Sequence, residues 1–275
     1  MRIVDTHLHL VYLDRFSYPW LDDVPSLKHN FPVAEYVRQA KPLGIEAALY
    51  MEVDVADGQR EDEARFATSI DPFVTGAIVS GRPESADFPQ YLETVAGIGG
   101  VRGIRRILHT SPDELSQSAL FAQNLRKLED YDLPFDLCVL ARQLPVGRAL
   151  VDKCPDVQFV LDHCGVPDIA GGDFPTWRDE ISELAQRPNV AAKISGVVAY
   201  AGNEWTAADL RPYVEHVIAS FGWNRVVWGS DFPVCTLTAD LARWVEATNQ
   251  IVAGASESEK SRLFHQNAER IYHLA

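Results

Sequence analysis

The chain has 275 residues, 47% of them hydrophobic, and a formal net charge of −14 from 25 basic and 39 acidic side chains. This composition supports a large core, and the acidic balance argues against nucleic acid and anionic membranes as partners. The four cysteines are scattered without a C-x-x-C pair, which argues against a zinc ribbon or a disulfide framework. Neither a charged-then-apolar leader nor an apolar run of membrane-spanning length is present, so we expect a soluble cytoplasmic protein.

The first predicted strand, 2–7, carries two histidines at its end, in the stretch Val4-Asp5-Thr6-His7-Leu8-His9. Residues two apart on a strand point to the same side, so His7 and His9 present their imidazoles on one face. Two adjacent imidazoles are costly to bury without partners. The spacing therefore favours a binding or metal site over two separately satisfied core histidines.

Strand and helix patterns then alternate along the whole chain. We expect strands at 2–7, 47–53, 73–79, 101–108, 135–140, 158–161, 190–194 and 225–228. We expect helices at 33–43, 59–69, 88–96, 117–130, 143–153, 177–186, 210–221 and 239–252, and a last helix over 258–274. Short apolar strands indicate burial on both faces. The pattern predicts one α/β domain over 1–275, a single (β/α)8 TIM-type barrel with an extra C-terminal helix, rather than an open doubly wound sheet.

Two insertions interrupt this alternation, and both follow a strand. Residues 12–31 contain Tyr18-Pro19-Trp20-Leu21, and residues 166–176 contain Gly171-Gly172. The strand-to-helix side of such a barrel holds the active site, so we expect both insertions to form walls of the pocket. Trp20 is expected either to cover the apolar face of a substrate ring or to hold its loop against the barrel.

Polar residues also cluster where predicted strands end, and in a barrel these ends meet at one mouth. They are His7, His9, Glu52, Asp54, Arg102, Arg105, Arg106, Asp162, His163 and Asp231. Alternation places Arg102 and Arg105 on opposite faces of strand four, so at least one arginine lies outside the lumen. Strand five, over 135–140, offers no such group at its end, and Lys193 on strand seven is interpreted as a core or rim residue.

Four motifs resemble the amidohydrolase superfamily. They are Asp5-Thr6-His7-Leu8-His9, Asp162-His163-Cys164-Gly165, Gly229-Ser230-Asp231-Phe232-Pro233 and Asn267-Ala268-Glu269-Arg270-Ile271-Tyr272. Within it, Tyr18-Pro19-Trp20-Leu21 and Val101-Arg102-Gly103-Ile104-Arg105 are similar to the branch of sugar-lactone hydrolases.

The resemblance implies a role for each site residue. Asp231 is the expected general base, and His163 is expected to act beside it. His7, His9, Glu52 and His163 are the expected metal ligands, or the histidines are donors to the lactone carbonyl. The expected substrate contacts are Trp20, Arg102, Arg105 and His163.

The metal content implied by the resemblance is one divalent ion, with zinc the first choice. The lysine of strand four and the histidine of strand five that hold metal in many members are replaced by arginines and Cys138, which argues against a dinuclear centre. Metal-free catalysis, with arginine and histidine as electrophiles, also occurs in this branch.

The expected activity is opening of the ring ester of a small sugar-acid lactone, such as L-fucono- or L-rhamnono-lactone, by base-assisted attack of water. The alternatives are a metal-dependent decarboxylase of a small unsaturated or aromatic acid, and a binding barrel with a degenerate site. The expected partner is the small lactone alone, without nucleic acid or membrane, and assembly into a homo-oligomer is left open.

Overall fold

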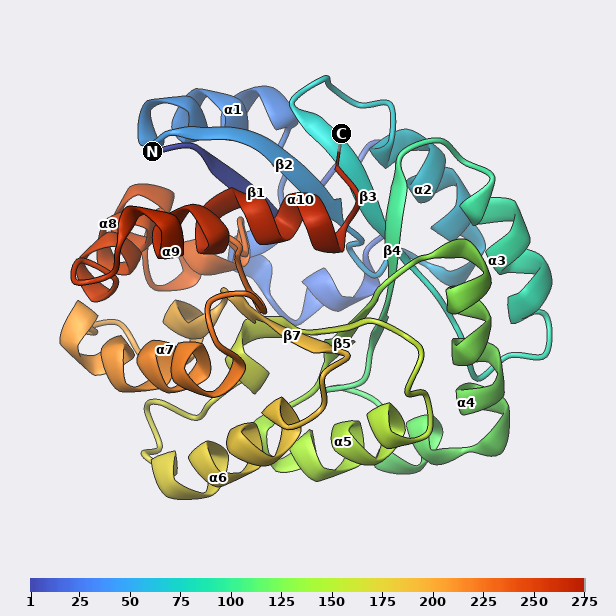
Figure 1. The fold of residues 1–275 in the computed structure, drawn as a ribbon. Coiled ribbons are helices and arrows are strands. Elements are labelled where there is room, and N and C mark those ends of the chain that lie inside the picture. Colours follow the sequence, from blue (N-terminus) through green and yellow to red (C-terminus); the bar gives the residue numbers. More distant parts are fainter. Residues whose placement is uncertain (275) are drawn as a thin grey trace.

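Eight parallel strands form a barrel in the computed structural model, which describes residues 1–274 (Figure 1). They are β1 (Ile3–Leu8), β2 (Ile45–Met51), β3 (Val74–Ser80), β4 (Val101–Ile107), β5 (Phe135–Cys138), β6 (Phe159–Leu161), β7 (Val190–Ile194) and β8 (Val226–Trp228). Each strand pairs with the next along the chain. The predicted (β/α)8 barrel is therefore confirmed.

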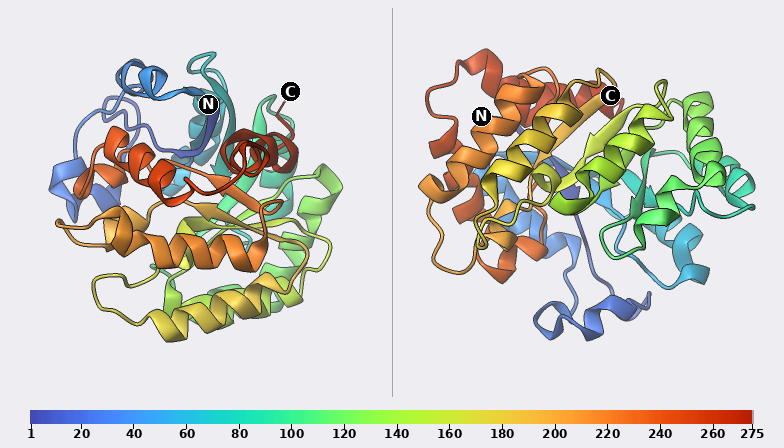
Figure 2. Two further views of the ribbon diagram at one scale, coloured as in Figure 1. Left: turned by 60° about the vertical axis from the view of Figure 1, so that its left-hand side comes forward. Right: turned by 90° about the horizontal axis from the view of Figure 1, so that it is seen from below.

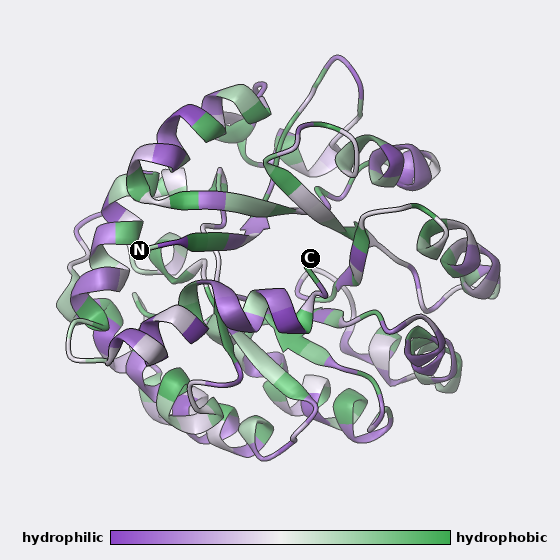
Figure 3. Ribbon diagram, turned by 45° about the horizontal axis from the view of Figure 1, so that its top comes forward, coloured by the Kyte–Doolittle hydropathy of each residue, from purple (hydrophilic) through white to green (hydrophobic). Residues whose placement is uncertain are grey.

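Helices surround the strands on the outside of the barrel (Figure 3). They are α1 (Val33–Ala40), α2 (Arg60–Ala67), α3 (Phe88–Ala96), α4 (Ala119–Leu125), α5 (Leu144–Asp152), α6 (Phe174–Ala185), α7 (Ala207–Phe221) and α8 (Leu241–Ile251). Hydrophobic residues predominate on the strands, while the helices carry both kinds, as amphipathic helices around a core do. Among residues 1–274, no helix combines the length and apolar character that a bilayer crossing requires.

The last helical segment is less regular than the single helix expected over 258–274. It consists of α9 (Glu257–Ser261), one π-helical turn (Arg262–Gln266) and α10 (Asn267–Ile271). Side chains of α10 and Tyr272 pack inside one end of the barrel against Val4, Leu49 and other lumen residues. The C-terminal segment thus closes the end of the barrel opposite the strand-to-helix loops.

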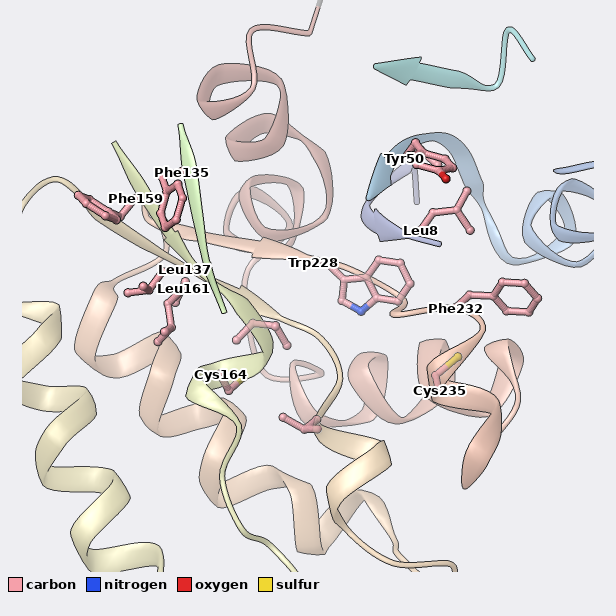
Figure 4. Packing of buried hydrophobic residues seen from close by; sticks show 14 of the residues in the cluster. Leu8, Tyr50, Phe135, Leu137, Phe159, Leu161, Cys164, Trp228, Phe232 and Cys235 are labelled. Atoms are coloured by element: carbon pink, nitrogen blue, oxygen red, sulfur yellow. The ribbon is translucent and has the colours of Figure 1, made fainter. Parts of the chain in front are cut away.

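The outer faces of the strands form the main core with the helices. Phe135 and Leu137 of β5 and Phe159 and Leu161 of β6 point outward into it (Figure 4). Since neighbouring residues on a strand point to opposite sides, Asp136 between Phe135 and Leu137 faces the lumen. A polar group in the middle of β5 therefore lies in the lumen, beneath the mouth of the barrel.

The seam between β8 and β1 is closed by single contacts near the mouth. Asp231 N–H donates to His7 O at 2.9 Å, and His9 N–H donates to Phe232 O at 2.7 Å. Buried Asp5 adds a link, because its Oδ1 accepts from the backbone N–H groups of Ser230 at 2.7 Å and His7 at 3.0 Å. Asp231 is consequently fixed beside the two histidines.

The mouth of the barrel lies away from both termini. The insertion after β1 (dark blue) projects at the end opposite to the N- and C-terminal residues (Figure 2). It contains two 3-10 turns, Pro19–Asp22 and Pro25–Leu27, and its base is pinned by a bridge between Val11 and Phe31. The insertion is therefore a wall on the strand-to-helix side, as expected.

Asn267 connects α10 to β8 and provides a test of this closure. Its buried side-chain amide donates to Trp223 O at 2.7 Å and to Val226 O at 2.8 Å. Asn267→Ala removes the donor from two buried carbonyls, so we expect the free energy of unfolding in urea to fall by about 1–3 kcal/mol. Gln266→Ala, at the exposed neighbouring position, should change it by less than ~0.5 kcal/mol. Equal values for both variants would contradict this role.

Candidate active site

His7 and His9 lie side by side at the end of β1, with their Nε2 atoms 3.1 Å apart. Both are buried, at 0% and 7% exposure. Burial, together with the charges of Lys193 near His7 and Arg105 near His9, lowers the pKa of both imidazoles well below the usual value. Both rings are therefore neutral at pH 7, and each carries one hydrogen and one lone pair.

The second nitrogen of each ring limits what Nε2 can do. Nδ1 of His9 lies 3.1 Å from Met51 O, and because a carbonyl only accepts, Nδ1 of His9 carries the hydrogen. Its Nε2 therefore presents a lone pair to His7. Two arrangements are possible for Nε2 of His7. It either donates a hydrogen to the lone pair of His9, or it presents its own lone pair, in which case a cation between the two rings would bind both nitrogens.

Asp231 supplies a carboxylate at this point. It follows β8 in a left-handed conformation with φ 57°, which is uncommon outside glycine and marks a residue held in place by its surroundings. Its Oδ1 lies 3.7 Å from Nε2 of His7 and 3.6 Å from Nε2 of His9. Burial raises the pKa of Asp231 well above the usual value.

The three atoms fit a divalent cation. Zinc holds imidazole nitrogens at about 2.0–2.1 Å, so two of them around a tetrahedral ion lie about 3.3 Å apart, near the 3.1 Å between the two histidines. A second possible ligand group combines His7, Asp162 and His163. There the ammonium of Lys193 already lies 3.1 Å from Asp162 Oδ1 and would repel a metal ion. His7, His9 and Asp231 are therefore the better ligand set.

Glu52 does not belong to this set, because it forms a buried ion pair with Arg105. Nε of Arg105 donates to Glu52 Oε1 at 2.6 Å and Nη2 donates to Glu52 O at 2.9 Å, while Oε2 accepts from Asp54 N–H at 2.9 Å. The remaining Nη1 group of Arg105 lies 3.4 Å from Nε2 of His7. The geometry thus gives Glu52 the role of positioning Arg105, in place of the expected role as a metal ligand.

His163 stands on the other side of Asp231. Its Nδ1 lies 2.9 Å from Ser195 Oγ and 3.9 Å from Asp231 Oδ2, and burial lowers its pKa to about 3. Gly196 makes room for the ring, since a Cβ there would come within 2.4 Å of Nδ1 of His163. Among residues 1–274 nothing hydrogen-bonds Nε2 of His163, so this atom is available to a ligand.

The two remaining predicted substrate contacts have different positions. Nε1 of Trp20 donates to Val53 O at 2.8 Å, one residue beyond Glu52, so the indole lies beside the mouth. Arg102 stands at the start of β4, where it lines a cavity with Gly100, Tyr131 and Tyr272 at the opposite end of the barrel. The structure brings Trp20 to the site and does not bring Arg102 there.

Lys193, Asp136 and His109 lie in the lumen but are not among the site residues predicted from the sequence. Lys193 is fully buried and pairs with Asp136 and Asp162 directly beneath His7. His109 lies near His163 and Arg105, with Nδ1 3.0 Å from Cys138 Sγ, and burial and the charge of Arg105 lower its pKa to about 4. Because side chains alternate between the two faces of a strand, Asp136 could have been predicted to face the lumen from its outward-facing neighbours. His109 could have been predicted to face the lumen from its even spacing with Arg105.

Comparison with known proteins identifies a family and several relatives within it. Residues 4–274 match the family model described as amidohydrolase. L-fucono-1,5-lactonases from Burkholderia ambifaria and Burkholderia multivorans are 32% and 30% identical to the chain. The first alignment covers 70% of this chain and 68% of the relative, and the second covers 98% and 96%. The crystal structure of an amidohydrolase from Burkholderia multivorans with bound zinc has a TM-score of 0.91 at 24% identity, with 100% of both chains covered.

Glu63 of α2 makes the stability of the site region sensitive to pH. It is buried, its Oε1 accepts from Tyr50 Oη at 3.0 Å and from Val53 N–H at 2.8 Å, and burial and the charge of Glu52 raise its pKa to about 8. In the unfolded chain its pKa is about 4.3. Between these values the folded state binds more protons, so the free energy of unfolding falls as pH rises.

Glu63→Gln, which cannot ionise, should reduce this fall between pH 5 and pH 8 by at least ~1 kcal/mol. The measurement is urea unfolding at pH 5, 6.5 and 8, with Glu93→Gln on the exposed face of α3 as the control. A wild-type profile that Glu63→Gln leaves unchanged would show that Glu63 is ionised in the folded state.

Proposed function

The chain belongs to the amidohydrolase family, and we propose that it hydrolyses the ring ester of a sugar-acid lactone by base-assisted attack of water. One observation carries this proposal: the carboxylate of Asp231 faces Nε2 of His7 and His9 at 3.7 and 3.6 Å in a buried lumen. The L-fucono-1,5-lactonases at 32% and 30% identity support a lactone as the substrate.

Asp231 is suited to take a proton from water. Its backbone N–H donates to His7 O at 2.9 Å, and its carboxylate lies 3.6–3.9 Å from the imidazoles of His7, His9 and His163, with no lysine or arginine of residues 1–274 in an ion pair with it. Without a bound metal ion, burial raises the pKa of Asp231, which strengthens it as a base relative to an exposed aspartate. A positioned general base typically contributes about 10²–10⁴-fold to the rate.

The lactone carbonyl needs a positive group beside its oxygen. When water adds to the carbonyl carbon, negative charge develops on that oxygen, and Nη1 of Arg105 is a cationic donor on the Nε2 side of His7, at 3.4 Å from that nitrogen. Glu52 keeps the guanidinium in this orientation through two hydrogen bonds to Nε and Nη2. With Ser195 Oγ donating to Nδ1 of His163, Nε2 of this ring carries the hydrogen and can donate a further hydrogen bond.

Collapse of the tetrahedral intermediate completes the reaction. The C=O double bond re-forms from the oxyanion, the bond from this carbon to the ring oxygen breaks, and Asp231 gives its proton to the departing alkoxide. The product is the open hydroxy acid, which releases one proton to solvent at neutral pH. Water supplies both the added hydroxyl group and the hydrogen on the new alcohol, so the equation balances without another reactant.

We propose zinc as the cofactor, held by Nε2 of His7, Nε2 of His9 and an oxygen of Asp231. When bound, a divalent ion in this position polarises the lactone carbonyl and acidifies water. In the metal-free alternative, the cation nearest to the same point is Nη1 of Arg105. Elemental analysis of the purified protein, with turnover measured before and after chelation, distinguishes the two.

A decarboxylase of a small aromatic or unsaturated acid is the alternative activity, because a 5-carboxyvanillate decarboxylase and a 2,6-dihydroxybenzoate decarboxylase share the fold, with TM-scores of 0.68 and 0.72. The two reactions differ in their products. A lactonase releases one proton per ring opened, which a pH indicator detects, whereas a decarboxylase releases carbon dioxide. A panel of five- and six-membered sugar lactones beside aromatic acids therefore tests the proposal.

Asp231→Asn should retain the fold and lower kcat for the best lactone by at least ~10²-fold, since an amide cannot accept the proton. KM should change little, because the side chain keeps its size and its backbone contacts. Circular dichroism and thermal melting check the fold. Near-wild-type turnover in a folded Asp231→Asn protein would rule out this mechanism.

Trp20 tests the substrate class. If its ring covers the C–H face of a sugar, Trp20→Ala should raise KM for sugar lactones by about tenfold or more, and much less for a small unsubstituted lactone. Trp20→Phe keeps an aromatic face but loses the bond to Val53 O, so it separates stacking from loop anchoring. Similar losses on both substrates, together with a lower melting temperature, would assign Trp20 a packing role only.

A further inference from the structure

A buried ammonium group lies under the histidine pair. Lys193 of β7 is fully buried, and its Nζ is surrounded by oxygen acceptors: Asp136 Oδ1, Asp162 Oδ1 at 3.1 Å and Thr6 O at 3.2 Å. Lysine is almost never fully buried unless it is paired. The proposed reaction does not use this group, so its position needs another explanation.

The same ammonium also lies 3.2 Å from Nδ1 of His7, and Asp162 Oδ1 lies 3.4 Å from that atom. Nδ1 of His7 therefore faces both a donor and an acceptor. If Lys193 donates to it, the ring hydrogen sits on Nε2 and points at His9. If Nδ1 donates to Asp162, Nε2 of His7 presents a lone pair to the site.

Counting hydrogens selects the second arrangement. An ammonium has three hydrogens, and two of them are accepted by Asp136 Oδ1 and Thr6 O. The third lies between Nδ1 of His7 at 3.2 Å, which has hydrogen-bond geometry, and Asp162 Oδ1 at 3.1 Å, which forms an ion pair. Hydrogen bonds to carboxylates are stronger than those to a neutral imidazole nitrogen. Both oxygens of Asp162 are buried without a well-formed hydrogen bond among residues 1–274, so Asp162 is the group that needs the hydrogen of His7.

We infer that Lys193 is a positioning residue: it holds Asp162 against Nδ1 of His7, and this contact turns the Nε2 lone pair of His7 toward the cation site. The unit runs from Asp136 through Lys193 and Asp162 to His7. Carboxylates that accept from the far nitrogen of a ligating histidine orient the ring and make it a better ligand. The inference rests on the cation site proposed above, to which it adds the residue that prepares one ligand.

The series of contacts from Asp136 to His7 is anchored at Asp136 by Tyr272 of the C-terminal segment. Oη of Tyr272 donates to Asp136 Oδ1 at 3.0 Å, the same oxygen that accepts from Lys193. Tyr272→Phe removes this bond but leaves Lys193, Asp162 and His7 in place. It is therefore a matched control that disturbs the same buried cluster without touching the contact to His7.

The test compares wild type, Lys193→Met and Tyr272→Phe after metal removal. Nitrogen-15 NMR of the histidine side chains reports which ring nitrogen of His7 carries the hydrogen, and calorimetric titration with zinc chloride reports affinity. We expect hydrogen on Nδ1 of His7 in wild type and Tyr272→Phe. In Lys193→Met we expect a changed His7 spectrum and a zinc dissociation constant raised roughly 10–100-fold.

Lys193→Met leaves Asp136 without its cation, so Asp136→Asn/Lys193→Met is the second variant should the first fail to fold. Hydrogen on Nε2 of His7 in the wild type, or wild-type zinc affinity in a folded Lys193 variant, would overturn the inference. Neither readout involves a lactone. Failure of lactone turnover with the expected NMR and zinc results would count against the proposed function alone.

Discussion

The structure depends on two buried cations that hold carboxylates inside the barrel. Arg105 binds Glu52 through Nε at 2.6 Å, and Lys193 pairs with Asp136 and Asp162. Removing one member of such a pair leaves an unpaired buried charge, which is strongly unfavourable. The Arg105–Glu52 pair joins β4 to the end of β2, and Lys193 joins β7 to β5 and the end of β6. The same interactions therefore stabilise the lumen and give the imidazoles above them fixed neighbours.

The barrel could be predicted from the sequence because its signals are local and repeated. Short apolar strands alternating with amphipathic helices predict parallel strands covered on both faces. The C-terminal helical segment was predicted less accurately, because the π-helical turn Arg262–Gln266 interrupts it and contains no proline or glycine that would indicate a break. The packing of Tyr272 inside the barrel is a long-range contact that local patterns do not specify.

The site could be predicted only in part. His7, His9, His163 and Asp231 meet as expected, because they end three strands whose order the fold determines. The partner of Glu52 was not predictable, since pairing with Arg105 depends on side-chain reach across the lumen between β2 and β4. Arg102 lies at the start of β4, and alternation alone could not tell which arginine faces the mouth.

In the proposed reaction, Asp231 directs water to the acyl carbon of a lactone. The most direct measurement is turnover of L-fucono-1,5-lactone in ¹⁸O-labelled water, followed by mass spectrometry of the product and its fragments. We expect one ¹⁸O atom per turnover, located in the new carboxylate, with the ring oxygen retained as the hydroxyl. Label in the hydroxyl position would contradict attack at the acyl carbon, and the absence of turnover across the panel of sugar lactones would contradict lactone hydrolysis.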